Sequence, residues 1–539
     1  MTMLIERNVT VIATDGTQLL LDHYLPRPRG GRERPGAGLL VWIRTPYGRK
    51  GIASIAKRFA AGGAHVVVEA SRGTDGSGGR YEPFSITSTD AADVLAWLRG
   101  RSWFSGAIVS WGISAIGYAS WALAEIDAPE WRLAILQDAA SELRDGLVYP
   151  GGIFAGKLML GFLGGIEWQA QHRTASVPRT MLASVRIARR ANKVLAELPL
   201  GTADERLVGH RVEYFQDWLD HERSDEFWQS LDRRHGVPGL PDLVHLASGW
   251  YDVCLATTLA DYREMCRAGK TVRFVIGPWY HGRGAIDKTY RADVDTWLRA
   301  AADGGRQPDN DPVCVHVGGI DDWRNLPDWP PPGYPPCVWH LHPNGRLVTD
   351  RPPASSADRY RYDPAQPTPA VGGAVENFDG TAGAKDNRQL EQRPDVLTYT
   401  SDVLTHDLEV IGPVAATIVF RSSLEHTDVV VRLCDVHPDG RSVNLCDGAR
   451  RLRPGHPAVA ADGTRSVDLD LVAVAHVFRS GHRLRLQVSS GAHPRLARNT
   501  GSGEPLATAV DLRPADQEVF HDPEHPSTLT LPCAMRSVM

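Results

Sequence analysis

The sequence lacks the features that mark export, membrane insertion or a disulfide framework. Its first residues contain no basic segment followed by an apolar one, and the 539-residue chain has no run of about 18 apolar residues. The seven cysteines are an odd number and include no C-x-x-C pair, which is typical of reduced, buried thiols. We therefore expect a cytoplasmic protein without a membrane segment.

An excess of charge of one sign is also missing. The 59 basic and 64 acidic residues give a net charge of −5, so nothing in the composition points to nucleic acid or a membrane surface as a partner. The hydrophobic fraction of 42% is that of an ordinary globular protein, and the length exceeds what one hydrophobic core supports. We expect two or three domains, and a homodimer stays possible.

The N-terminal part of the chain alternates apolar strands with helices. Leu39–Ile43, His65–Glu69 and Leu133–Gln137 are nearly unbroken apolar runs, typical of strands covered on both faces. An amphipathic helix pattern at Asp90–Arg99 lies between two of them, and a β-hairpin is expected before them, between Asn8 and Leu25. The alternation predicts an α/β fold with a mostly parallel sheet.

This pattern changes twice along the chain. Helical periodicity replaces strands between residues 144 and 235, and almost every segment after the proline-rich stretch 329–336 is strand-like. Short alternating strands joined by turns are typical of a β-sandwich or jelly roll. The predicted domains are residues 1–143 (first part of the α/β core), 144–235 (helical cap insertion), 236–333 (second part of the core) and 334–539 (C-terminal jelly roll).

A short motif in the core carries the first indication of chemistry. Ser114 lies between Gly112 and Gly117, after the apolar run Ile108–Trp111 and before a segment of small and apolar residues. A strand, a sharp turn and a helix would place this serine on a nucleophile elbow, whose strained backbone needs small neighbours. The usual elbow is G-x-S-x-G, so the second glycine comes one place late. Taken alone, the motif fits a glycine-rich turn with an incidental serine equally well.

Two later residues complete a catalytic set. A serine nucleophile needs a histidine base and an acid that orients it, and α/β hydrolases carry them in the chain order Ser, Asp or Glu, His. Asp252 and His281 follow in that order, each shortly after an apolar strand. The order predicts the triad Ser114, Asp252 and His281. The backbone N–H of Ala115 and a donor at Tyr47 would form the oxyanion hole.

The chain resembles a known family over nearly its whole length. It is similar to the CocE/NonD-type serine hydrolases, the cocaine-esterase-like and glutaryl-acylase-like enzymes related to X-prolyl dipeptidyl aminopeptidases. The resemblance implies an α/β-hydrolase core, an inserted helical cap and a C-terminal jelly roll over the active-site mouth. The matching stretches are RTPY (44–47), 71–73, 77–79, WGIS (111–114), 149–152, GWYD (249–252), GPWYH (277–281), 393–401, 407–412, 435–440 and 475–482.

The resemblance also implies roles for single residues. The Tyr47 hydroxyl would be an oxyanion donor, and Ala115, which stands where the family usually has an aromatic residue, implies a wider or differently shaped acyl pocket. Cys254 stands where cocaine esterase often has an aromatic residue. Trp168 in the cap, together with Ala374 and Val375 in the jelly roll, falls where relatives line the substrate cleft.

Acidic residues near the expected cleft have two interpretations. Relatives that bind an α-amino group use clustered carboxylates, and Asp138, Glu142 and Asp145 lie in the corresponding region. The favoured interpretation is that they are solvated charges of the cap. Likewise, His340 and His342 have a spacing that can bind a metal, but a polar sheet face is the favoured interpretation, and we expect no metal.

We therefore expect a serine esterase or acylase that cleaves an ester or amide bond of a small-molecule acyl compound through an acyl-Ser114 intermediate, without a cofactor. Two alternatives stay open. The same triad could serve an acyltransferase or amide-forming enzyme, in which an amine or alcohol takes the acyl group. Less favoured is a non-catalytic binding protein that uses the jelly roll as its ligand module.

Overall fold

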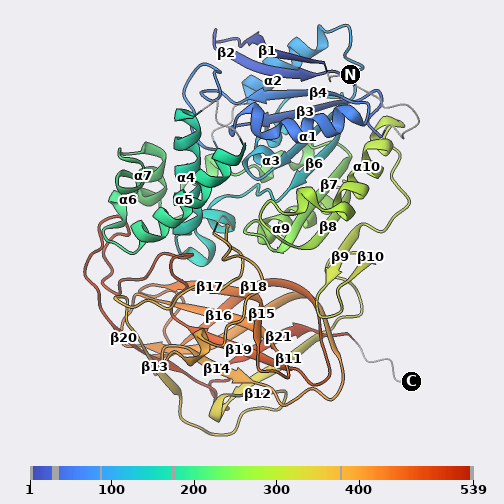
Figure 1. The fold of residues 1–539 in the computed structure, drawn as a ribbon. Coiled ribbons are helices and arrows are strands. Elements are labelled where there is room, and N and C mark those ends of the chain that lie inside the picture. Colours follow the sequence, from blue (N-terminus) through green and yellow to red (C-terminus); the bar gives the residue numbers. More distant parts are fainter. Residues whose placement is uncertain (1–3, 27–34, 85–87, 173–176, 377–378, 535–539) are drawn as a thin grey trace.

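The chain folds into an α/β core, a helical cap and a C-terminal β domain (Figure 1), in a computed structural model that describes residues 4–26, 35–84, 88–172, 177–376 and 379–534. The core lies at one end of the molecule, the orange and red β domain lies at the other, and the green cap helices stand beside the core. The predicted α/β-hydrolase core with an inserted cap and a C-terminal jelly roll is confirmed.

The core is built on a sheet of ten described strands in the order β1-β2-β4-β3-β5-β6-β7-β8-β9-β10. The strands from β4 to β9 in this order run parallel, and the predicted hairpin forms the antiparallel pair β1 and β2. Parallel strands bring their carboxyl ends to one edge of the sheet, where ligand sites form. The strands are β1 Ile5–Ile12, β2 Gln18–Tyr24, β3 Leu40–Thr45, β4 His65–Ala70, β5 Ile108–Ile113, β6 Trp131–Gln137, β7 Leu243–Tyr251, β8 Thr271–Tyr280, β9 Val313–Val317 and β10 Asp322–Leu326.

Helices cover both faces of this sheet, which explains why the strands are apolar on both sides. Helices α1 (Arg49–Ala61) and α10 (Lys288–Ala302) pack into one buried apolar cluster. Helices α2 (Ser88–Arg99) and α9 (Leu255–Arg267) pack into a second cluster on the opposite face. All six residues of β3 are buried as a result.

The cap is inserted between β6 and β7. It contains α4 (Gly156–Gln171), α5 (Val177–Leu195), α6 (Ala203–Val208), α7 (Glu213–Asp220) and α8 (Glu226–Leu231). Its apolar faces form a cluster that also includes Ala115 and Tyr118 of the elbow helix α3 (Ala115–Ser120). The cap therefore closes over the region that follows Ser114.

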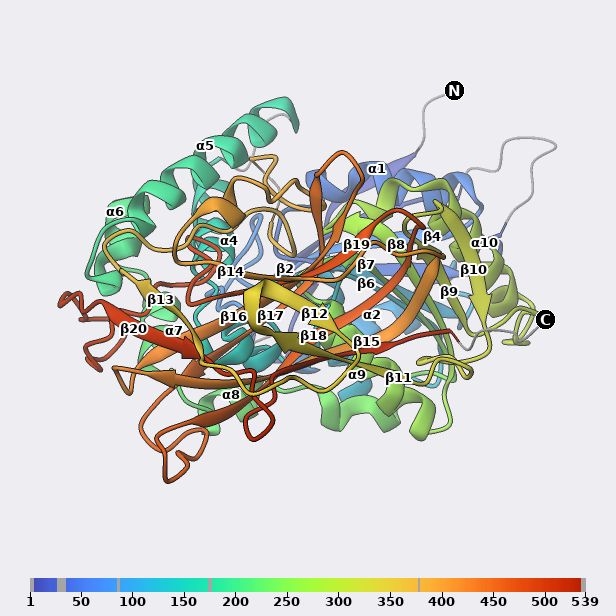
Figure 2. The same cartoon turned by 90° about the horizontal axis from the view of Figure 1, so that it is seen from below.

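The C-terminal domain is a β-sandwich with its own apolar core. One of its longest strands, β18, reaches the α/β core, where Ala473, Ala475 and Val477 pack beside β9. Figure 2 shows the sandwich strands crossing under the α/β core. The strands are β11 Pro336–His342, β12 Arg346–Val348, β13 Asp358–Tyr362, β14 Leu397–Thr400, β15 Leu408–Ser422, β16 Thr427–Val436, β17 Ser442–Leu452, β18 Arg465–Phe478, β19 Arg483–Ser489, β20 Ala515–Val519 and β21 Thr528–Pro532.

Candidate active site

The elbow around Ser114 is held by a contact between its two glycines. Ser114 follows β5 and precedes α3, with φ of 56° and ψ of −131°, a backbone conformation that costs energy for a residue with a side chain. A Cβ atom on Gly112 would lie 2.5 Å from Cα of Gly117 and 2.4 Å from the carbonyl oxygen of Ile116. The late second glycine is therefore the residue that the first glycine packs against.

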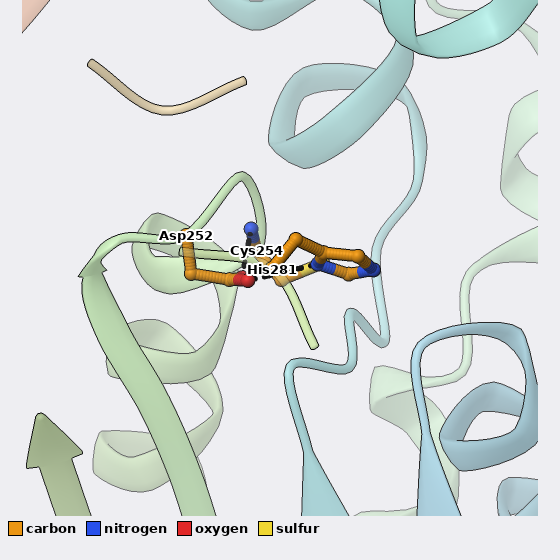
Figure 3. A group of neighbouring side chains, drawn as sticks. All are labelled: Asp252, Cys254 and His281. Carbon is orange, nitrogen blue, oxygen red and sulfur yellow. Dashed lines mark hydrogen bonds and ion pairs between the residues drawn. The ribbon is translucent and has the colours of Figure 1, made fainter. Parts of the chain in front are cut away.

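Ser114, His281 and Asp252 form a hydrogen-bonded chain at the carboxyl ends of β5, β8 and β7. His281 Nε2 lies 2.9 Å from Ser114 Oγ, and His281 Nδ1 lies 2.8 Å from Asp252 Oδ2. The other carboxylate oxygen of Asp252 accepts the backbone N–H of Cys254 at 2.6 Å. The structure thus brings together the three residues predicted as the triad, and Figure 3 shows Asp252, Cys254 and His281 lying side by side.

The charges around His281 raise its pKa and so make it a stronger base. Burial opposes the protonation of His281, but the charge of Asp252 and its hydrogen bond outweigh burial, so the pKa of His281 lies well above its usual value. Asp252 is buried, with 3% of its surface exposed. A buried carboxylate beside a histidine stabilises the imidazolium that forms when the histidine accepts a proton.

Tyr47 and Ala115, the predicted oxyanion donors, both line the cavity that contains Ser114. Tyr47 follows β3 and lines the same cavity as Ser114. Burial raises the pKa of Tyr47 to about 12, although a hydrogen bond with Ser114 and the charge of His281 act in the opposite direction. The hydroxyl therefore keeps its proton at neutral pH and can donate it. Ala115 is the first residue of α3, so its backbone N–H has no acceptor within the helix.

Asp138 is a buried carboxyl group near Asp252 and His281, and the prediction that it is a solvated charge is wrong. It follows β6, is 0% exposed, and its Oδ2 accepts the backbone N–H of Gly282 at 2.9 Å and the Gln137 amide at 3.1 Å. Burial, and then the charge of Asp252, raise the pKa of Asp138 well above its usual range. Because Gly282 directly follows His281, Asp138 ties the histidine loop to the end of β6.

The other two acids of that group behave differently. Asp145 has an exposed side chain (68%), as predicted for a solvated charge. Glu142 is half-buried, and its carboxylate accepts the backbone N–H groups of Arg144, Asp145 and Gly146 at 2.7 to 3.1 Å. These hydrogen bonds give Glu142 a structural role at the start of the cap.

A small cavity of about 50 Å³ opens at Ser114, and all three parts of the molecule line it. Its wall is mostly hydrocarbon and aromatic, with one acidic side chain, Glu376, from the C-terminal domain. The core and the linker to the cap contribute Tyr47, Phe84, Ser114, Ala115, Tyr118, Ala140, Leu143, Val253, Cys254 and His281, and the cap contributes Leu147, Leu158, Met159 and Phe162. The cavity suits a small, largely apolar group.

Of the four residues predicted to bind substrate, Cys254 alone lines this cavity. Trp168 lies toward the end of α4, where its ring stacks on His172 at 4.5 Å, and it lines a separate cavity of about 340 Å³ on the other side of Tyr47. Ala374 and Val375 line a third cavity of about 250 Å³, whose wall also includes residues of the cap and, from the core, Asp252, Val253 and Ala256. The β domain reaches the cavity at Ser114 one residue later, at Glu376.

Within the described residues, two groups of three side chains have the donor atoms and spacing to hold a metal ion. These groups are Asp252, Cys254 and His281, and Asp435, His437 and His482. Hydrogen bonds already join the histidine and aspartate of each group, at 2.8 Å in both. His340 and His342 belong to neither group, and His342 instead hydrogen bonds to the carbonyl of Asp350.

These features define a class of enzyme. A nucleophile elbow after a central parallel strand, with an acid and a histidine at the ends of later strands, is the arrangement of α/β-hydrolase-fold hydrolases.

None of the helices in the described ranges is long and apolar enough to cross a membrane.

Comparison with known proteins gives the family. Residues 15–283 match the X-Pro dipeptidyl-peptidase (S15) family, and residues 294–530 match the X-Pro dipeptidyl-peptidase C-terminal non-catalytic domain. The chain is 30% identical over 577 aligned residues to cocaine esterase of Rhodococcus sp. (strain MB1 Bresler), covering 98% of both chains. The chain belongs to the CocE/NonD-type family of serine hydrolases, whose members cleave ester or amide bonds, and the predicted family is confirmed.

Solved structures share this fold over almost the full length. An aminopeptidase from a marine sediment archaeon, Thaumarchaeota archaeon, aligns with a TM-score of 0.81 at 22% identity, covering 99% of this chain and 96% of that one. An α-amino acid ester hydrolase aligns with a TM-score of 0.79 at 22% identity, covering 98% and 96%. A CocE/NonD family hydrolase from Staphylococcus aureus aligns with a TM-score of 0.71 at 14% identity, covering 98% and 94%.

Proposed function

We propose that this protein hydrolyses an ester or amide bond of a small acyl compound through a covalent intermediate on Ser114. The observation that carries the proposal is the hydrogen-bonded chain from Ser114 Oγ through His281 to Asp252, with distances of 2.9 and 2.8 Å. In this mechanism His281 Nε2 takes the proton of Ser114 as its oxygen attacks the carbonyl carbon. The same proton then goes to the leaving group, and Asp252 orients the imidazole throughout.

The proposed oxyanion donors are the Tyr47 hydroxyl and the Ala115 backbone N–H. Both lie beside Ser114, and Tyr47 stays protonated because burial raises its pKa. Donors fixed in a water-poor site stabilise the charge that develops on the carbonyl oxygen, and losing one costs about 10²- to 10³-fold in kcat. In the second half of the reaction, His281 takes a proton from water while the water oxygen bonds to the acyl carbon. The bond from the acyl carbon to Ser114 Oγ then breaks, His281 returns the proton to Oγ, and the acid leaves.

The cavity restricts the group that can lie next to the nucleophile. About 50 Å³ of space lined by Phe84, Leu143, Leu158 and Phe162 favours a short, apolar acyl or alcohol group. The names of cocaine esterase and of the α-amino acid ester hydrolase describe ester cleavage by relatives, so esters are the first substrates to test.

A fluorophosphonate probe tests the proposal directly, because it labels a serine that a base has activated. We expect the wild type to be labelled and to hydrolyse p-nitrophenyl esters of short acyl groups faster than those of long ones. The Ser114→Ala variant should do neither, whereas Ser120→Ala, which removes another buried serine from the same helix, should be labelled normally. An unlabelled wild type that turns over no ester would refute the proposal.

The same assay separates hydrolysis from acyl transfer. Adding an amine such as hydroxylamine should leave the rate of p-nitrophenol release unchanged when deacylation by water is already fast. The product should then be almost entirely the free acid. A product that is mainly the hydroxamate at low amine concentration would favour the acyltransferase alternative instead.

A further inference from the structure

A buried carboxylate of the β domain lies among three histidines, and none of the four residues lines the cavity at Ser114. Asp435 is the penultimate residue of β16, and its side chain is 3% exposed. Three imidazole nitrogens lie near its carboxylate oxygens: His482 Nδ1 at 2.8 Å, His476 Nε2 at 3.0 Å and His437 Nε2 at 3.9 Å. The proposed hydrolysis uses none of these residues, so their meeting requires another explanation.

The pairing of two strands brings three of these residues together. β16 and β19 are antiparallel neighbours, and Val436 lies opposite Arg483. The next pair outward is therefore His437 and His482, whose ring centroids are 4.4 Å apart. Asp435 and His437 are two residues apart along β16, so their side chains point to the same face of the sheet. The register of the strands thus sets the arrangement.

The donor atoms have nearly the spacing of a zinc site. Those of Asp435, His437 and His482 all lie within 4.8 Å of one another. In a tetrahedral zinc site with bonds of about 2.0–2.1 Å, neighbouring ligand atoms are about 3.3 Å apart. The distances from the Asp435 carboxylate to His482 and His437, 2.8 and 3.9 Å, lie on either side of this value. Changes of about 0.5 Å in these two distances would give the spacing of zinc ligands.

The hydrogen bond between His482 and Asp435 is compatible with a metal ion. A neutral imidazole carries one proton, which either ring nitrogen can hold. With the proton of His482 on Nε2, Nδ1 offers a lone pair, and a metal ion can take the place of the proton between Nδ1 and the carboxylate. Two histidines and one carboxylate, with water as the fourth ligand, are a known ligand set for zinc.

His476 would hold the carboxylate in position for the metal. A carboxylate oxygen has two lone pairs, so Asp435 Oδ2 can accept from His476 Nε2 and also bind an ion. Hydrogen-bond partners of this kind orient metal ligands. His476 lies on β18 where this strand meets the core, because the backbone N–H of Gly318, the residue after β9, donates to the carbonyl of Ala475 at 2.9 Å. The group therefore lies where the β domain joins the α/β core.

The charges and atom types of the group suit a divalent transition metal. When its histidines are neutral, the group carries the single negative charge of Asp435. Arg441 Nη2 lies 3.5 Å from His437 Nδ1, but this guanidinium is paired with Asp439 at 2.7 Å. Imidazole nitrogen suits zinc, whereas calcium and magnesium prefer oxygen ligands. His437 and His482, with 27% and 13% of their side chains exposed, leave the group accessible from solvent.

We infer that Asp435, His437 and His482 bind one zinc ion or a similar divalent transition metal, with His476 orienting the carboxylate. This inference goes beyond the proposed hydrolysis, which needs no metal, and it departs from the expectation of no metal drawn from the sequence. The ion would join the end of β16 to the start of β19 beside the core. It should therefore stabilise the folded β domain, because the unfolded chain does not hold the three ligands together.

Titration of the EDTA-treated full-length protein with ZnCl₂ tests the inference. We expect calorimetry to show an ion that binds at this group, and saturating ZnCl₂ to raise the Tm by at least about 2 °C. His476→Ala should weaken binding about 10- to 100-fold, and His437→Ala, which removes a ligand, should weaken it more. His340→Ala is the matched control and should bind zinc as the wild type does. MgCl₂ should not raise the Tm, because magnesium prefers oxygen ligands.

The outcomes assign the ion to this group or refute the inference. A wild type that shows neither binding heat nor a higher Tm with ZnCl₂ would overturn it. So would binding that His437→Ala leaves unchanged, because the ion would then lie elsewhere, as at Asp252, Cys254 and His281. Circular dichroism shows whether His437→Ala is folded, and His482→Gln repeats the test if it is not. Fluorophosphonate labelling reports on the proposed hydrolysis alone, so the two ideas can fail separately.

Discussion

Replacing Asp138 should show how much the position of His281 depends on its second carboxylate neighbour. Asp138 accepts the backbone N–H of Gly282 and the amide of Gln137, and its own N–H donates to the carbonyl of Ala247 on β7 at 2.8 Å. Leucine has the same branching, with two methyl groups in place of the two oxygens, but no acceptor. The Asp138→Leu variant would therefore leave the buried amide of Gln137 and the half-buried N–H of Gly282 unpaired. A buried unpaired donor costs about 1–3 kcal/mol and a half-buried one less, so we expect the unfolding free energy to fall by about 2–4 kcal/mol.

The activity of this variant should fall as well. Gly282 is the residue after His281, so losing its hydrogen bond frees the loop that holds the imidazole against Ser114. A displacement of about 1 Å at a catalytic group costs on the order of 10²-fold, so we expect kcat to fall about 10- to 100-fold. KM should change little, because Asp138 does not line the cavity at Ser114.

Asp138→Asn keeps a hydrogen-bond acceptor at this position and removes the group that can ionise. The amide oxygen can still accept the Gly282 N–H, so kcat should stay within about 5-fold of the wild type. In the wild type, burial raises the folded-state pKa of Asp138 above its usual value of 3.8. Between these two pKa values the folded protein keeps a proton that the unfolded chain loses, so wild-type stability falls as pH rises. The stability of the Asn variant relative to the wild type should therefore increase from about pH 4 to about pH 8.

Urea unfolding at the two pH values and p-nitrophenyl acetate kinetics measure these effects, with Asp145→Asn as the exposed control. A Leu variant with wild-type stability and kcat would refute the positioning role. An Asn variant whose relative stability decreases as pH rises would refute the assignment of a raised pKa to Asp138.

Tyr47→Phe should lower kcat about 10²- to 10³-fold with little change in KM, since it removes a proposed oxyanion donor, and a loss below about 3-fold in steady-state kinetics would exclude that role. The acid limb of the kcat/KM profile should have its midpoint above 6.5, the usual value for histidine, because the pKa of His281 is raised; a midpoint below 6.5 would contradict this. Gly112→Ala should fail to fold by circular dichroism, because its Cβ would lie 2.4 Å from the Ile116 carbonyl oxygen. Cys254 should resist iodoacetamide at neutral pH, as mass spectrometry would show, because burial raises its pKa to about 12; rapid alkylation of the folded protein would contradict that.

The sequence could predict that the three proposed triad residues lie together, because each of them follows a strand. Ser114, Asp252 and His281 follow apolar runs, and a parallel sheet brings the carboxyl ends of those runs to one edge whatever lies between them. The late glycine was the weak point of the motif. The packing of Gly112 on Gly117 gives its reason, but it depends on the path of α3 across the end of β5, which spacing alone does not reveal.

The residues around Ser114, Asp252 and His281 were harder to predict. Asp138 directly follows an apolar strand, as Asp252 and His281 do after theirs, and this signal could have shown that it belongs to the buried edge of the sheet rather than to the solvated cap. Trp168 was placed by family resemblance, but the length of α4 carries its ring to the far side of Tyr47. Ala374 and Val375 missed the cavity because the loop path decides which residue reaches it, and no periodicity in the sequence records that path.

The residues that the sequence predicts and those that it does not predict differ in where they lie and in what they are proposed to do. The groups proposed for bond cleavage lie on the ends of buried strands, where a change of one side chain disturbs the core. Glu376 lies on a loop of a different domain, which the pair of Lys157 and Asp379 fastens to the cap. A substitution at Glu376 can alter the charge of the cavity and leave the hydrogen bonds of Ser114, His281 and Asp252 in place. The cavity at Ser114 therefore takes its one acidic side chain from a segment that can change without disturbing those hydrogen bonds, and the contact between the β domain and the cap brings that side chain to the cavity.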